Sequence, residues 1–128
     1  MFNSDWYLSL TKPILSPLNW VFTPIWTILY FLIFISLIIY INSYALNKKI
    51  GYIFFCLQMF LNIIWAPVFF GLKNIKGGLI VIILLDIFVF LMIYKFFKAS
   101  ILSGAILIPY FLWILFATYL NIGYLLLN

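Results

Sequence analysis

The sequence predicts an all-α membrane protein, built as an antiparallel transmembrane helix bundle with four spans in a single domain over residues 1–128. The chain is 69% hydrophobic with a mean hydropathy of +1.30, and only 7% of its residues are charged. A soluble domain needs more polar side chains than this to cover its surface. The uncharged stretches are long enough to cross about 30 Å of hydrocarbon as helices, whereas a membrane barrel would show shorter alternating segments.

The positions of the charged residues delimit each element. A loop rich in tryptophan and proline occupies residues 1–21, and the spans are predicted at 22–42, 50–72, 77–94 and 101–127. Each span has about the 20 residues that a membrane-crossing helix needs. The connections between the spans are short, so neighbouring helices are expected to run antiparallel.

The net charge of +5 comes from lysines at the predicted helix ends, where they can reach lipid headgroups. We therefore expect the lipid bilayer, and no nucleic acid, as a partner. The loops after the first and third spans hold Lys48, Lys49, Lys95 and Lys98, one lysine more than the other side. The positive-inside rule then places both termini outside the cytoplasm of an integral membrane protein, which we expect in a bacterial cell envelope.

Several residue types that catalysis or metal binding would use are rare or missing. The chain has no histidine, which is the commonest metal ligand, haem ligand and general base, so we predict no metal site and no catalytic residue. Cys56 is the single cysteine and is expected to be a small apolar side chain. The first residues do not have the pattern of a cleavable signal peptide.

Aromatic and amide side chains recur at helical spacing on three predicted spans. Trp26 and Tyr30 share one face, Gln58, Asn62 and Trp65 share another, and Trp113 and Ala117 share a third. Aromatic rings with a few amides suit a flat conjugated ligand. Two other interpretations stay open: the rings could anchor the helices at the membrane interface, and the amides could hydrogen-bond neighbouring helices.

Three sequence blocks in the same order resemble the TspO/MBR family of translocator proteins, tryptophan-rich sensory proteins and peripheral-type benzodiazepine receptors. The resemblance covers nearly the whole chain. The blocks are Trp6-Tyr7-x-x-Leu10-x-Lys12-Pro13 with Trp20-Val21-Phe22-x-Pro24-Ile25-Trp26-x-x-Leu29-Tyr30, then Gln58-x-x-x-Asn62-x-x-Trp65-x-Pro67-x-Phe69-Phe70-Gly71, and Pro109-Tyr110-x-x-Trp113-x-x-Phe116-Ala117-Thr118-x-Leu120-Asn121.

The resemblance implies an integral membrane binding protein, transporter or sensor for porphyrin-like tetrapyrroles, with a haem-like ligand held without covalent attachment. It also implies a homodimer. Porphyrin degradation has been proposed within the family, but without histidine we do not expect an enzyme. The implied pocket residues are Trp26, Tyr30, Gln58, Asn62, Trp65, Trp113 and Ala117, beneath a covering loop with Trp6, Tyr7, Pro13 and Trp20.

Two features depart from the family pattern. Members usually have five spans, and here the Trp-rich loop begins at residue 6. The first helix is absent from this sequence, so we expect either a four-span variant or a chain whose first helix lies upstream of Met1. A bundle open on that side would expose interior faces to lipid or to a second copy. Tyr124 is followed by Leu-Leu-Leu-Asn rather than by the basic residue of the sterol motif, so sterol binding is not supported.

Asp86 lies in the middle of the third predicted span, where a carboxylate is costly unless it is neutral, paired or hydrated. The matched blocks assign it no role. It could be a neutral structural group or a proton carrier. The second interpretation favours a different function, a small proton-coupled multidrug exporter that uses Asp86.

Overall fold

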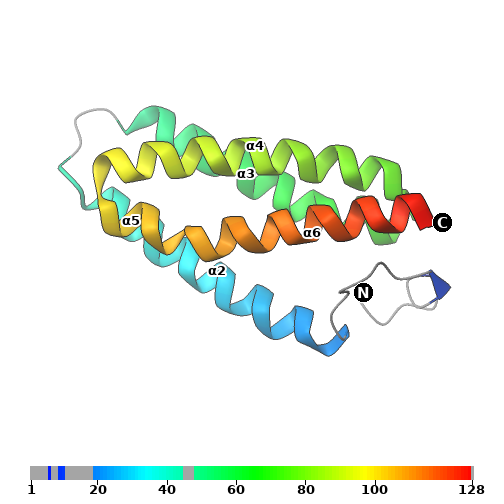
Figure 1. Cartoon of the computed structure of the whole chain (residues 1–128). Coiled ribbons are helices and arrows are strands. Elements are labelled where there is room, and N and C mark those ends of the chain that lie inside the picture. Colours follow the sequence, from blue (N-terminus) through cyan, green and yellow to red (C-terminus); the bar gives the residue numbers. More distant parts are fainter. Residues whose placement is uncertain (1–5, 7–8, 11–18, 45–47, 128) are drawn as a thin grey trace.

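The computed structural model describes residues 6, 9–10, 19–44 and 48–127, with only the backbone of residues 19–23 and 70–71. Within these residues every regular element is helical. The order is α2 (Asn19–Ile41), α3 (Lys49–Ala66), the π-helix η1 (Pro67–Gly71), α4 (Ile75–Ala99), α5 (Ile101–Ile106) and α6 (Ile108–Leu127). Consecutive long helices run in opposite directions along one axis (Figure 1).

Four segments are long and apolar enough to cross a membrane, which confirms the predicted number of spans. They are Pro24–Ile41, Lys49–Phe69, Ile75–Ala99 and Ile101–Leu127. The predicted end of the third span at residue 94 was too early, because α4 continues through Lys95 and Lys98 to Ala99. The stems of these lysines can lie along the apolar helix while their ammonium groups reach the headgroups, so the charges do not end the helix.

The fourth span is one segment in the sequence and two helices in the structure. Ser100 separates α4 from α5, with an extended backbone and a side chain that accepts a hydrogen bond from the Ser103 amide. The break between α5 and α6 falls at Leu107, two residues before Pro109. Pro109 is therefore in the first turn of α6, where a residue without an amide proton costs no helical hydrogen bond.

Helix α4 is the centre of the bundle, since it packs against α3, α5 and α6. Helix α2 contacts mainly α5 and, to a smaller extent, α6. Figure 1 shows α2 diverging from α6 toward the end at which α2 begins and α6 finishes. The position of α2 is therefore set chiefly by contacts near its last residue, Ile41.

Two sets of contacts hold α2 at this end. The Ser36 hydroxyl lies 2.6 Å from the Ser103 carbonyl oxygen, and the Ser103 hydroxyl donates to the Ser36 carbonyl at 2.9 Å. Tyr40 stacks on Phe96 of α4 with ring centroids 4.0 Å apart. Because small hydroxyl side chains let two backbones approach closely, this serine pair fixes α2 against α5.

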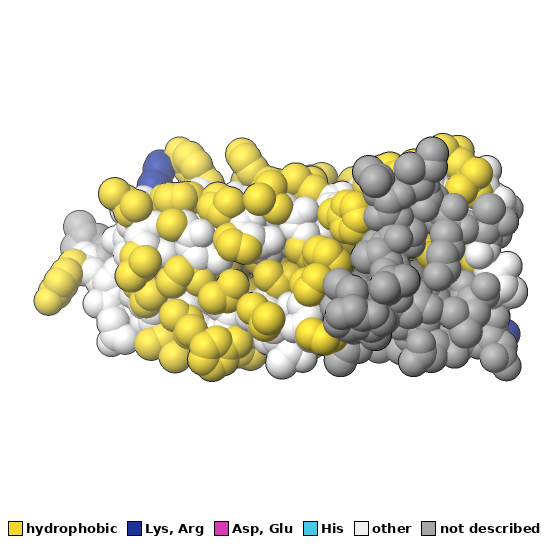
Figure 2. All heavy atoms as spheres, turned by 60° about the horizontal axis from the view of Figure 1, so that its bottom comes forward, with side chains coloured by type: hydrophobic (Ala, Val, Ile, Leu, Met, Phe, Trp, Pro, Cys, Tyr) yellow, Lys and Arg dark blue, Asp and Glu magenta, His cyan; other side chains and the backbone are white. Residues whose placement is uncertain are grey.

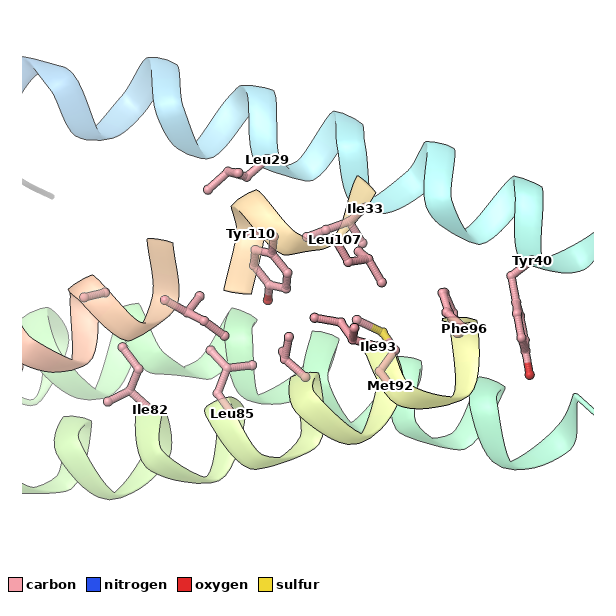
Figure 3. Packing of buried hydrophobic residues seen from close by; sticks show 13 residues of the cluster. Leu29, Ile33, Tyr40, Ile82, Leu85, Met92, Ile93, Phe96, Leu107 and Tyr110 are labelled. Atoms are coloured by element: carbon pink, nitrogen blue, oxygen red, sulfur yellow. The ribbon is translucent and has the colours of Figure 1, made fainter. Parts of the chain in front are cut away.

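The core lies along α4, where buried aliphatic and aromatic side chains meet α2, α5 and α6 (Figure 3). In this view Leu29 and Ile33 of α2 lie near Tyr110 and Leu107. The outer surface is also apolar: Phe31 and Phe60 are more than half exposed, and Figure 2 shows hydrophobic side chains across most of the described part of one face. An exposed apolar surface of this kind is stable in lipid and not in water.

Candidate functional site

A chain of hydrogen bonds between side chains crosses the interior of the bundle and joins three helices. The Tyr30 hydroxyl on α2 donates to Oδ1 of Asn62 on α3. Asn62 Nδ2 donates to the Tyr110 hydroxyl on α6 at 2.7 Å, and that hydroxyl donates to Gln58 Oε1 at 2.8 Å. We call Tyr30, Asn62, Tyr110 and Gln58 the polar network. Both amides therefore face the bundle interior.

The polar network ends in a hydrogen-bond donor that has no acceptor. Gln58 has 0% of its surface exposed, and its Nε2 group has no partner among the described residues. A buried amide without a partner loses its hydration and gains nothing in return, at a cost of about 1–3 kcal/mol. Such a group is a candidate for an unfilled interaction with a ligand or a water molecule.

Aromatic rings collect beside the polar network, on the side toward the beginning of α2. Trp26 lies one turn before Tyr30, with ring centroids 5.8 Å apart. Trp26 also meets Trp113 of α6 edge to face, at a centroid distance of 6.4 Å and an angle of 84°. Both indoles are only partly buried. The structure thus brings the predicted tryptophans of the first and fourth spans into contact.

Trp65 belongs to a neighbouring cluster. Its indole Nε1 donates to Asn121 Oδ1 at 3.1 Å, and Asn121 Nδ2 donates to the Ile75 carbonyl at 3.0 Å. Phe69 stacks on Trp65 at 5.3 Å and meets Trp6 at 5.6 Å. Trp6 therefore packs against the cluster at this end of the bundle.

The seven predicted pocket residues come from α2, α3 and α6. Tyr30, Asn62 and Gln58 belong to the polar network, Trp26 and Trp113 are in contact beside it, and Trp65 belongs to the neighbouring cluster. Ala117 is 7% exposed and belongs to the core, where a small side chain leaves room between helices. Of the predicted covering loop, Tyr7 and Pro13 lie outside the described residues. Only the backbone of Trp20, in α2, is described.

Sequence reasoning missed Tyr110 as a site residue, although it is fully buried and donates to one amide while accepting from the other. It precedes Trp113 by three residues and Ala117 by seven, so it lies on the same helix face. That spacing is a signal that could have included it. Asn121 continues the same stripe one turn further along α6.

Asp86 makes a contact with α6 that bears on its protonation state. Its Oδ2 atom lies 2.6 Å from the Thr118 hydroxyl oxygen, which is also 2.8 Å from the Ile114 carbonyl oxygen. A hydroxyl has one proton and cannot donate to both acceptors. If Asp86 is a neutral acid, its own proton goes to Thr118 and the Thr118 proton goes to Ile114. The geometry therefore favours a neutral acid that links α4 to α6. The buried Oδ1 atom has no hydrogen-bond donor in the described part of the chain, which agrees with this assignment.

This arrangement predicts that Asp86→Asn keeps the fold, because an amide N–H replaces the donating acid. Infrared difference spectra between the unaltered chain and Asp86→Asn are expected to show the carbonyl band of a protonated carboxylic acid. Asp86→Ala removes the link and should lower the free energy of unfolding by about 1–2 kcal/mol. If the infrared difference spectrum at neutral pH instead shows the band of an ionised carboxylate for Asp86, the assignment is contradicted.

Comparison with known proteins gives a consistent result. The TspO/MBR family model matches residues 1–127. The chain is 46% identical to the "Tryptophan-rich protein TspO" of Archaeoglobus fulgidus, over 96% of this chain and 80% of that protein. It is 33% identical to the "Tryptophan-rich sensory protein" of Cereibacter sphaeroides, over 97% and 77%. It is 30% identical to the human "Translocator protein", over 91% and 70%. With its transmembrane helices and its tryptophan cluster, the chain belongs to the TspO/MBR family.

Proposed function

We propose that this chain is a membrane binding protein for planar, porphyrin-like tetrapyrroles, which it takes up by reversible, non-covalent binding for sensing or transport. The observation that supports this most is the contact between Trp26 and Trp113, beside the polar network. Relatives named as tryptophan-rich sensory and translocator proteins agree with a membrane sensor or binding protein in general. The choice of a tetrapyrrole is our inference from the resemblance to the family, and the aromatic and amide side chains of the site suit a flat conjugated ligand.

The side chains that are present suit a ligand of this class. A macrocycle with a wide apolar face gains most from indole and phenol rings on which it can stack. Trp26, Tyr30 and Trp113 supply such rings from two helices, and both indoles are only partly buried. The unpartnered Gln58 Nε2 group can donate to a polar atom of the ligand, which would remove the cost of leaving it unsatisfied.

The arrangement of the helices supports a route by which such a ligand enters. Helix α2 is held at its far end by the serine pair and by Tyr40, while its contact with α6 is small. A displacement of the first turns of α2 would separate Trp26 from Trp113 while the serine pair and the Tyr40 contact stay in place. A planar ligand needs only a narrow opening of this kind.

Binding is the mode of action that we propose, rather than catalysis. The relatives are named as sensory or translocator proteins and not as enzymes. The site offers rings and neutral hydrogen-bonding groups, which hold and orient a ligand. The affinity is then set by stacking and by the amide donors.

The test is a titration of the chain in lipid nanodiscs with protoporphyrin IX. We expect a saturable shift of the porphyrin Soret band with one ligand per site, together with quenching of tryptophan fluorescence. Empty nanodiscs of the same lipid are the control, because porphyrins partition into bilayers. A response that does not saturate and equals that of empty discs would overturn the proposal.

A further inference from the structure

A groove lies at the end of the bundle opposite the tryptophans, between the end of α2 and the turn from α4 to α5. Its volume is about 670 Å³. We call it the lysine-end groove, and its lining residues are Ile38, Ile39, Asn42, Ser43, Tyr44, Lys98, Ala99 and Ser100. Ile38 and Ile39 lie within the first span, whereas the polar side chains lie at or just beyond the ends of α2 and α4. The groove therefore crosses the boundary between hydrocarbon and headgroups.

Positive charge at this groove is not neutralised by the described part of the protein. Lys98 lines the groove, with its ammonium nitrogen 4.4 Å from the centroid of the Tyr94 ring. Lys48 lies close by, because its Nζ donates to the Ile41 carbonyl at 2.6 Å, next to the lining residue Asn42. Among the described residues the one carboxylate side chain is Asp86, which lies twelve residues before Lys98, or roughly 18 Å along α4. One lysine therefore lines the groove and a second lies near its edge, and the described residues place no carboxylate close to either.

The remaining polar groups add donors and acceptors at the same level. Asn42 Nδ2 donates to the Ile38 carbonyl at 2.9 Å, and an amide nitrogen has a second proton to offer. The Ser43 hydroxyl donates to the Tyr40 carbonyl at 2.7 Å, which leaves its oxygen free to accept. These groups suit the glycerol and ester region of a lipid. Ile38, which is 58% exposed, offers an apolar surface for an acyl chain.

We propose that the lysine-end groove binds one anionic glycerophospholipid, with its phosphate near Lys98 and Lys48 and an acyl chain along Ile38 and Ile39. The predicted orientation agrees with this occupant. It puts the end with Lys48, Lys49, Lys95 and Lys98 at the cytoplasmic leaflet, where anionic lipids attract basic groups between helices. The occupant of this groove would be a lipid of the membrane itself.

Native mass spectrometry of the detergent-solubilised chain with equal amounts of phosphatidylglycerol and phosphatidylcholine tests the proposal. We expect phosphatidylglycerol to be retained preferentially. Lys98→Gln should reduce its retention about fivefold, the usual contribution of one lysine near a membrane surface. Lys76→Gln removes the same charge at the beginning of α4, at the other end of the bundle, and should leave retention unchanged.

A second variant tests the location rather than the charge. Asn42→Trp keeps both lysines but fills part of the groove, and is expected to reduce phosphatidylglycerol retention as well. Equal losses in Lys98→Gln and Lys76→Gln, equal retention of the two lipids, or full retention in Asn42→Trp would each overturn the proposal. Size-exclusion chromatography and circular dichroism are the controls for folding of each variant. We expect all of them to be folded, because the substituted side chains are exposed.

Discussion

Replacing Tyr110 by phenylalanine is expected to lower the free energy of unfolding by about 1–3 kcal/mol, although a single oxygen atom is removed. The Tyr110 hydroxyl accepts from Asn62 and donates to Gln58, so its loss breaks two hydrogen bonds. The Gln58 side chain would then have no hydrogen-bond partner among the described residues, since its Nε2 group already lacks one there. Reversible unfolding in mixed micelles, followed by circular dichroism, measures the change.

The matched control is Tyr44→Phe, because Tyr44 is 100% exposed and its hydroxyl lies far from the polar network. We expect no more than about 0.5 kcal/mol from this change. The double variant Gln58→Leu with Tyr110→Phe should recover part of the loss, since removing both partners leaves fewer unsatisfied groups than removing one. Equal stability of Tyr110→Phe and Tyr44→Phe would show that the polar network does not stabilise the bundle.

Replacing Trp26 or Trp113 by alanine is expected to weaken porphyrin binding about tenfold in each case. This corresponds to the roughly 1.5 kcal/mol that a good aromatic contact contributes beyond buried area. The two indoles are in contact, so each substitution also removes support from the other ring. The double variant should therefore lose less than the product of the two single effects.

The same Soret titration in nanodiscs measures these affinities, and Phe31→Ala is the control. Phe31 lies on α2 like Trp26, but its side chain is 68% exposed on the lipid-facing surface. We expect the Phe31→Ala variant to bind protoporphyrin IX with the same affinity as the unaltered chain. Unchanged binding in both tryptophan variants would place the ligand elsewhere, even if the chain itself binds porphyrin.

Much of the architecture was predictable because membrane insertion depends on local properties of the sequence. The number of spans, their antiparallel order and the helical class follow from uncharged stretches and short connections, and all are confirmed. The inward direction of Gln58 and Asn62 was also predictable, because an amide facing lipid would be unsatisfied. The family assignment is confirmed as well, since its motifs are short and ordered along the chain.

The partners of individual side chains could not be predicted in the same way. Periodicity puts Tyr30 and Asn62 on interior faces, but not at the same depth in the membrane. It also cannot show that Tyr110 lies between Asn62 and Gln58, or that Asp86 meets Thr118. The predicted end of the third span was too early for a related reason. A lysine at a membrane interface is compatible both with a loop and with the last turn of a helix.

By itself the sequence determined that this chain crosses a membrane as helices, which residues share a helix face, and to which family it belongs. These properties depend on composition, on the 3.6-residue period and on short motifs, all of which act within one helix. Only the tertiary structure decided which interior residues meet and where the fourth span divides into α5 and α6. It also decided that a groove forms beside Lys98. Those features depend on the relative depth and crossing of helices that are far apart in the sequence, and side-chain packing between the helices sets both.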